Sequence, residues 1–240
     1  MTLSIMVGLA AATFGGGFLR GYSGFGGALV MAPFFIHLLG PSESVALISV
    51  MHLITAFQGV RPSLRIYDRT IILPMLAAAT ISVPIGVYLL DLADPHTVKR
   101  AVAVIVVVFA ALLGFGIRLV GRPTFVKSIA AGSLAGILNG FSGMGGPPAI
   151  LYLLSHEDAS HQKRAGFILL FAVLYPVTVA ALWAGGALTY NSILYAFLLT
   201  PANYLATEVG RICFHRVHSK FFVPVCTIAL CITGLSMLFN

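Results

Sequence analysis

The sequence has very little charge. Only 9% of its 240 residues are Asp, Glu, Lys or Arg, whereas a soluble domain carries roughly a quarter. Because 59% of the residues are hydrophobic and the mean hydropathy is +1.00, the charges are too few to cover a surface in water. This composition also excludes disordered and collagen-like chains. It predicts an all-α polytopic membrane protein.

Cysteine is scarce as well, and the possible metal ligands are scattered. The chain has three cysteines, too few for a disulfide scaffold, and Cys213, Cys226 and Cys231 lack the spacing of a metal site. His161 and the acidic residues of the same loop show no ligand spacing either. We therefore expect no metal and no cofactor.

Basic residues outnumber acidic ones by 14 to 7, and they lie in short connections between apolar runs. They form no cluster with interleaved aromatic residues, so they indicate membrane topology and not nucleic-acid binding. If ten segments alternate sides, twelve of these fourteen basic residues fall in the odd-numbered connections. The positive-inside rule then places those connections in the cytoplasm of a cell inner membrane and both termini outside. The ten segments are 2–19, 24–39, 44–60, 70–90, 101–119, 125–139, 147–155, 165–184, 191–214 and 221–239.

Two pairs of segments are short for full crossings. Residues 124–155 number 32 and make about 48 Å of helix, whereas two crossings of the bilayer core need about 40 residues. A re-entrant hairpin that enters and leaves on the cytoplasmic side fits this length better. Residues 2–39 are nearly enough for two crossings, so a hairpin and a crossing pair both remain open there.

A glycine-rich motif occurs twice. The sequence GYSGFGG at 21–27 returns as GFSGMGG at 140–146, 119 residues later, with five of seven positions identical. The chain therefore divides into two homologous halves, 1–121 and 122–240. Because each half holds five segments, an odd number, the halves insert in opposite orientations. We expect two inverted five-segment repeats whose glycine-rich broken or re-entrant helices meet near the bilayer midplane, as in many secondary transporters.

The two motifs predict a site for an anion. Each precedes an apolar run, so we expect its serine and glycines at a helix N-terminus, where free N–H groups and the helix dipole attract negative charge. A cation is disfavoured because no acidic residue lies in a segment core, Glu208 being near a cytoplasmic end. The alternative is structural: glycines serve close helix packing, and serines bond carbonyl groups one turn back.

Four further polar residues lie within the apolar segments or beside the motifs. Arg20 precedes the first motif and binds an anion at mid-membrane if segments 2–39 form a hairpin; otherwise it is a cytoplasmic interface residue. Asn139 takes the same place before the second motif and donates to an oxyanion or to a neighbouring helix. His52 binds an anion, relays a proton or bonds a neighbouring helix. Pro201 is expected to interrupt its segment and either kinks it or presents Asn203 to the cavity.

These residues resemble the TauE/SafE family of sulfite exporters across essentially the whole chain. The resemblance rests on the paired motifs, on the prolines at 147 and 148 and on Arg164 followed by alanine. The family moves small anions such as sulfite, sulfoacetate and related organosulfonates. In many relatives a hydroxyl residue follows the Arg-Ala pair, whereas this chain has Gly166, which offers no hydroxyl. The resemblance implies that the central translocation region contains Ser23, Gly24, Gly26, Gly27, Ser142, Gly143, Gly145 and Gly146.

The sequence therefore predicts a carrier in the lipid bilayer that exports a small anion, with sulfite or an organosulfonate as the leading substrate. It indicates no oligomeric state. Two alternatives remain. An intramembrane serine hydrolase would use Ser23 as nucleophile and His52 as base, although the duplication of the serine motif without a second histidine counts against it. An anion channel, or a scaffold without transport activity, is the other.

Overall fold

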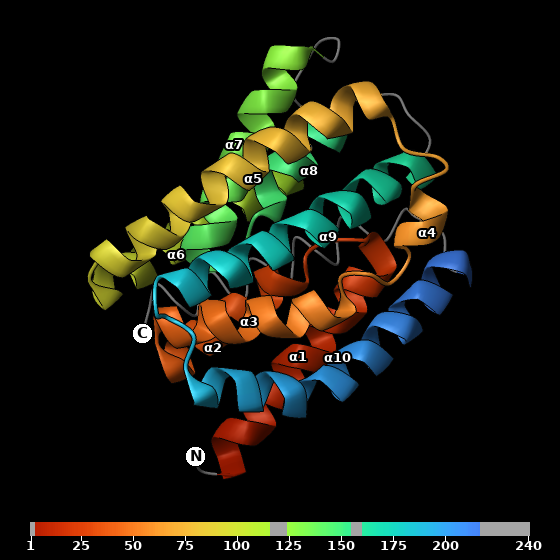
Figure 1. Ribbon diagram of the computed structural model, residues 1–240. Helices are drawn as coiled ribbons and strands as arrows, with labels where there is room; N and C mark the ends of the chain where they lie inside the picture. The colour runs from red at the N-terminus through yellow and green to blue at the C-terminus, as the bar shows by residue number, and fades with distance from the viewer. Residues whose placement is uncertain (1–2, 116–123, 155–159, 217–240) are drawn as a thin grey trace.

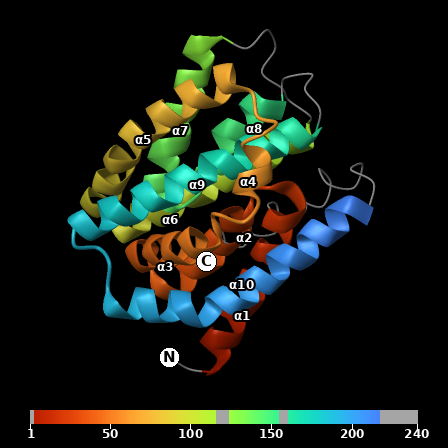
Figure 2. The same cartoon turned by 45° about the vertical axis from the view of Figure 1, so that its right-hand side comes forward.

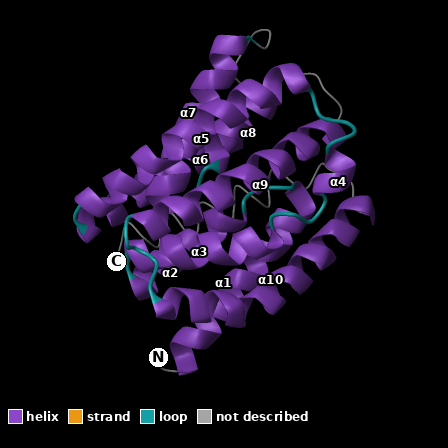
Figure 3. Ribbon diagram, in the orientation of Figure 1, coloured by secondary structure: helices purple, strands orange, loops and turns teal. Residues whose placement is uncertain are grey.

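The computed structural model describes residues 3–115, 124–154 and 160–216, and every regular element in these ranges is a helix (Figure 3). The all-helical prediction is thereby confirmed for the described part of the chain. The helices are α1 (Leu3–Ser23), α2 (Gly27–Leu39), α3 (Pro41–Thr55), α4 (Val60–Ser63), α5 (Arg69–Leu92), α6 (Pro95–Gly114), α7 (Phe125–Ser142), α8 (Gly146–Leu154), α9 (Ser160–Ala184) and α10 (Tyr190–Arg216).

Nine of the ten predicted segments contain a helix, and the tenth, 221–239, lies outside the described residues. The sequence did not predict the short α4, which follows α3 where a single segment over 44–60 was expected. Pro201 does not interrupt its segment, because α10 runs continuously through it. A proline within a membrane helix is tolerated where neighbouring groups satisfy the freed carbonyl.

Side chains of the connections start several helices. Asp68 accepts a hydrogen bond from the Thr70 backbone N–H at 2.8 Å and begins α5. Asp94 accepts from the N–H groups of His96 and Thr97 at the start of α6. These caps satisfy donors that the first helical turn leaves free. The Thr97 hydroxyl bonded to the Asp94 carboxylate, together with the two backbone bonds, lowers the pKa of Asp94 from its usual value.

Two helices are long and apolar enough to cross a membrane, as judged by length and composition within the described residues. They are Arg69–Leu92 and His161–Ala184. Large apolar side chains also point outward, including Ile81 of α5, which is 74% exposed, and Trp183 of α9, which is 75% exposed. Side chains of this kind on the outside of a folded chain suit contact with lipid and not with water.

Two helix pairs flank a central layer (Figures 1 and 2). Helix α1 packs along α10 at one side, and α5 packs along α7 at the other; α3 and α9 lie between the pairs and contact each other. Each outer pair joins one helix from residues 1–121 to one from residues 122–240. The two parts of the chain are therefore interleaved and do not form separate bodies.

Glycine allows both outer pairs to touch backbone to backbone. A Cβ added at Gly210 of α10 would lie 2.1 Å from the carbonyl oxygen of Phe18 and 2.8 Å from the backbone nitrogen of Tyr22. A Cβ added at Gly86 of α5 would lie 2.1 Å from the carbonyl oxygen of Ile137 and 2.9 Å from the backbone nitrogen of Phe141. Only glycine fits at such a crossing.

Replacing Gly86 or Gly210 with alanine is therefore expected to force each helix pair apart. Overpacking of this kind costs about 1–3 kcal/mol of stability, which thermal unfolding of the purified protein in detergent will detect as a lower midpoint. Gly15→Ala is the matched control, since its Cβ would meet Val30 at an ordinary 3.9 Å and alanine is the better helix former. Midpoints for Gly86→Ala and Gly210→Ala equal to that of the control would contradict the close crossing.

Candidate functional site

A buried polar cluster joins three helices near the first glycine motif. The Arg20 guanidinium of α1 bonds two residues of α3: Nη1 lies 2.9 Å from His52 Nδ1 and donates to Thr55 Oγ1 at 2.6 Å, while Nη2 donates to the Thr55 carbonyl at 3.3 Å. Asn203 of α10 reaches the same atoms, with Nδ2 at 3.4 Å from His52 Nδ1 and 3.3 Å from Thr55 Oγ1. All four side chains are buried.

Local helix geometry explains part of this convergence. His52 and Thr55 are three residues apart on α3, a spacing that puts both on one face of a helix. Gly27, the first residue of α2, lets that helix approach closely, because a Cβ there would lie 3.2 Å from both Arg20 Cβ and His52 Cε1. The structure thus brings together Arg20, His52 and Asn203, which the sequence analysis selected separately.

An aromatic side chain from α9 completes the cluster. The ring of Tyr175 lies 4.9 Å from that of His52 between centroids and 5.7 Å from the Arg20 guanidinium carbon. Phe171, one turn earlier on α9, stacks on Tyr175 at 5.4 Å. Aromatic faces attract a guanidinium electrostatically. Tyr175 and Thr55 were not predicted from the sequence, although Thr55 follows His52 at helical spacing.

The hydrogen bonds assign the tautomer of His52. Arginine has donors and no acceptor, so His52 Nδ1 must accept the bond from Arg20, and a neutral ring then carries its proton on Nε2. This Nε2 is buried and has no hydrogen-bond partner among the described residues, and neither has Asn203 Oδ1. A buried donor without a partner is costly, and this one belongs to the ring whose other nitrogen, Nδ1, faces the Arg20 guanidinium.

The cluster carries an uncompensated positive charge. The partners of Arg20 in the described structure are an imidazole, a hydroxyl, a carbonyl group and an aromatic ring, all neutral. None of the carboxylates in the described residues contacts its guanidinium; Glu208, the one in the adjacent cavity, pairs with Arg211. A buried charge of one sign without a counter-charge is unfavourable unless a ligand supplies it.

A cavity of about 520 Å³ leads to this charge. Its inner wall contains Arg20, Thr55, Gly24 and Phe171, all buried, and its mouth contains exposed residues such as Arg211. Gln58, Gly59 and Ile66, which also line the cavity, lie in the connection between α3 and α5. The cavity therefore connects one end of the helix bundle with the Arg20 guanidinium.

The first motif forms the turn between α1 and α2. Ser23 is the last residue of α1, not the first of α2, because Gly24 takes a φ of +83° and ends the helix. The Ser23 hydroxyl lies 2.6 Å from the carbonyl oxygens of Leu19 and Phe25 and accepts from the Phe25 N–H at 3.1 Å. Gly26, with a φ of +85°, precedes α2. Ser23 thus shapes the turn, and Gly24 lines the cavity.

The second motif forms a similar but neutral cluster away from this cavity. Asn139 of α7 donates to Thr178 Oγ1 at 2.7 Å and accepts from the Gly145 N–H at 3.2 Å. Ser142 ends α7 and donates to the Leu138 carbonyl at 2.8 Å, and Gly143 takes a φ of +73°. Gly146 begins α8 and is buried. None of these second-motif residues lines the cavity that reaches Arg20.

A hydrolase pair is not formed. The Ser23 hydroxyl bonds groups of its own turn, and His52 Nδ1 accepts from Arg20. The structure records no hydrogen bond between Ser23 and His52, whereas an activated serine needs one from its base. His52 is therefore a hydrogen-bond partner of Arg20 and not the base of Ser23.

Comparison with known proteins identifies one family. Residues 9–237, nearly the whole chain, match the sequence model of the family described as Sulfite exporter TauE/SafE. No curated protein and no solved structure matches the chain.

Proposed function

Because the chain belongs to the TauE/SafE family of sulfite exporters, which is a family of membrane transporters, we propose that it carries a small oxyanion outward across the cell inner membrane. Sulfite or an organosulfonate such as sulfoacetate is the leading substrate. With an interior-negative potential, moving one negative charge outward gains about 2.3 kcal/mol per 100 mV, so export needs no coupled ion.

One observation carries the proposal: among the described residues, the buried Arg20 guanidinium has only neutral partners. An arginine remains protonated in proteins, and its burial without a carboxylate leaves one positive charge to be balanced. An oxyanion that enters the cavity supplies the balancing negative charge. The guanidinium fork suits the paired oxygens of a sulfonate, sulfite or carboxylate group.

Neighbouring groups fit the same ligand. Among the described residues, His52 Nε2–H is a buried donor without a partner. Thr55, to which Arg20 donates, lines the cavity, and Asn203 Nδ2 lies 3.3 Å from Thr55 Oγ1. Because Gly24 has no side chain, its backbone forms part of the cavity wall; a Cβ added there would lie 2.9 Å from Arg164 Cγ. These neutral groups orient an anion without binding it so tightly that release becomes slow.

The helix crossings support an inverted repeat of residues 1–121 and 122–240. Gly210 contacts the backbone of Phe18 and Tyr22, and Gly86 contacts Ile137 and Phe141, which are the positions 119 residues further on. The pair α1–α10 therefore has the same register as α7–α5. We interpret the two pairs as equivalent parts of two halves related by a pseudo-two-fold axis.

Helix lengths support broken or re-entrant segments. Helix α8 has nine residues and is about 14 Å long, less than half the bilayer core of about 30 Å. The turns at Gly24–Gly26 and Gly143–Gly145 then lie within the membrane, where irregular backbone is tolerated against protein or a wet cavity. In this arrangement the cavity opens to the cytoplasm, and alternating access about Arg20 opens it outward.

The proposal is tested by thermal unfolding of the detergent-purified protein with sulfite, thiosulfate, sulfoacetate, taurine, sulfate and small carboxylates. A ligand of the folded state at about 100 times its dissociation constant adds about 2.7 kcal/mol of stability. We expect sulfite or a sulfonate to raise the midpoint and chloride at equal ionic strength to leave it unchanged. No shift with any of these anions would contradict the anion site. Saturable flux with exchange in proteoliposomes distinguishes a carrier from a channel.

A further inference from the structure

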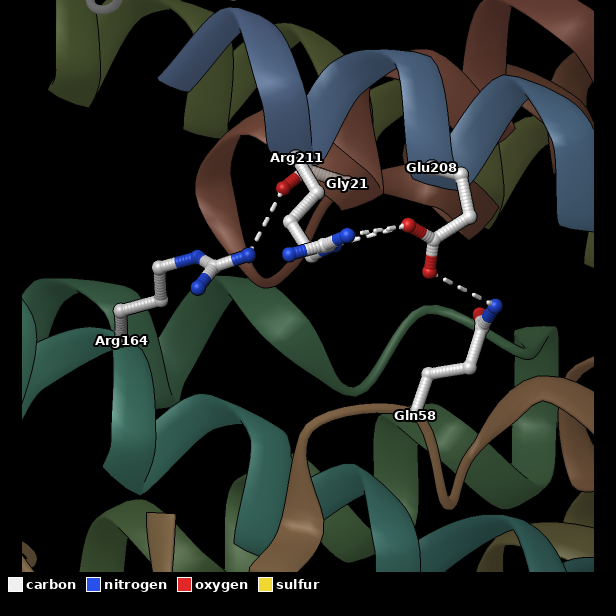
Figure 4. A network of polar contacts seen from close by, with 5 residues as sticks. All are labelled: Gly21, Gln58, Arg164, Glu208 and Arg211. Atoms are coloured by element: carbon white, nitrogen blue, oxygen red, sulfur yellow. Dashed lines mark hydrogen bonds and ion pairs between the residues drawn. The ribbon is translucent and has the colours of Figure 1, made fainter. Parts of the chain in front are cut away.

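The mouth of the cavity contains a charged cluster that the proposed site does not use (Figure 4). In α10, Arg211 pairs with Glu208, its Nη2 and Nε lying 2.7 and 2.8 Å from Glu208 Oε2. Gln58, which follows α3, donates to Glu208 Oε1 at 3.5 Å. Arg164 of α9 extends across the cavity and donates to the Gly21 carbonyl at 2.9 Å.

This cluster has a surplus of positive charge. Two guanidinium groups share one carboxylate, and Glu208 already bonds Arg211 through one oxygen and Gln58 through the other. Arg164 has neutral partners, the Gly21 carbonyl and the Phe214 ring at 4.9 Å, and its Nε is buried without a hydrogen-bond partner among the described residues. Arg164 and Arg211 lie near enough to repel each other.

The cluster has no equivalent at the corresponding place in the other half. The helix crossings align Gly210 with Gly86, a shift of 124 residues along α10 and α5. The same shift aligns Glu208 with Pro84 and Arg211 with Val87, which are both apolar. A packing feature common to both halves would recur, so the charges are specific to this mouth of the molecule.

We propose that Arg164 and Arg211 form a second station for the anion, at the mouth of the cavity that leads to Arg20. Glu208 competes with the anion for Arg211: its carboxylate holds the guanidinium while the cavity is empty, and an incoming oxyanion displaces it and binds Arg211 together with Arg164 Nε–H. This inference rests on the proposed function, because the same anion uses both stations.

The test is that Arg211→Gln and Glu208→Gln should change the KM for the anion in opposite directions. Initial rates of sulfite transport are measured in membrane vesicles with the cavity side facing the added sulfite. At low ionic strength Arg211→Gln is expected to raise KM about five- to tenfold and to leave kcat within about twofold of the value for the unsubstituted protein. The reason is that charges at a rim mainly change the rate at which the charged ligand associates. Glu208→Gln is expected to lower KM several-fold. High salt should reduce both differences, because it screens exposed charges.

Controls separate this station from a structural ion pair. Arg61→Gln removes an exposed positive charge at the same end, outside the cavity lining, and should leave KM unchanged. In the Arg211→Gln background, Glu208→Gln should change KM much less than it does alone, because Glu208 competes with the anion mainly for Arg211. If the two single substitutions change KM in the same direction, or if Arg211→Gln behaves as Arg61→Gln does, the station is refuted. Absence of transport of both sulfite and sulfoacetate by the unsubstituted protein would instead overturn the proposed function.

Discussion

Arg20→Gln is expected to abolish anion binding and transport while leaving the unliganded protein at least as stable as before. The arginine brings a buried charge whose partners in the described part of the chain are all neutral, so its replacement by a neutral side chain relieves an unfavourable burial. The bound anion, by contrast, loses its counter-charge. Loss of one partner from a buried charge pair costs about 2–5 kcal/mol, or roughly 30-fold to several thousand-fold in affinity.

Two readouts together check this expectation. The thermal midpoint without anion should stay or rise, and the increase caused by sulfite should disappear. Arg20→Lys keeps the charge but loses the planar fork, so it should retain part of the binding. Arg61→Gln, outside the cavity, should behave as the unsubstituted protein does. An Arg20→Gln protein that unfolds much earlier and still shows the full sulfite effect would mean that Arg20 is structural.

The helices themselves were predictable because charged residues and glycines separate the apolar runs of the chain. Apolar runs located nine helices. The two copies of the glycine motif located the turn between α1 and α2 and the turn between α7 and α8. The register of the serines was predicted wrongly. Ser23 and Ser142 end the preceding helices, since Gly24 and Gly143 adopt a positive φ. A glycine directly after the last helical residue is a common C-terminal signal, and it would have corrected the assignment.

The convergence of the site was not predictable from local pattern. Arg20, His52 and Asn203 are each unusual in an apolar segment and were therefore selected, but they lie on α1, α3 and α10. Their contact depends on the packing of α1 against α10, which joins opposite ends of the chain. Neither hydropathy nor charge encodes that pairing.

Thr55 and Tyr175 were missed because threonine and tyrosine are ordinary in membrane helices. A comparison of the two halves would have found them. His52 and Thr55 bond Arg20 with a spacing of three, and Tyr175 and Thr178 have the same spacing on α9, where Thr178 bonds Asn139. One half thus carries arginine and histidine where the other carries asparagine and tyrosine. In the proposed inverted repeat, this asymmetry places the charged group in one half only.

The side chain at position 52 decides whether the carrier moves a proton together with the anion. His52 accepts from Arg20 through Nδ1 and leaves Nε2–H without a partner. A glutamine offers the same two functions without titrating: its carbonyl oxygen accepts from Arg20, and its amide donates to an anion. We therefore expect His52→Gln to keep transport within about tenfold of the unsubstituted protein, because hydrogen-bond geometry is retained approximately.

His52→Leu removes both functions. Loss of a hydrogen bond to a charged group costs about 1.5–3 kcal/mol, so this variant should lose roughly 10- to 150-fold in anion affinity. Transport by both variants is measured over a range of pH with sulfoacetate, whose sulfonate and carboxylate remain ionised near neutral pH. A His52→Gln protein that transports with the pH dependence of the unsubstituted protein identifies His52 as a neutral ligand of the anion. If His52→Gln binds the anion but fails to transport it, a titrating imidazole is required and the carrier couples anion movement to a proton.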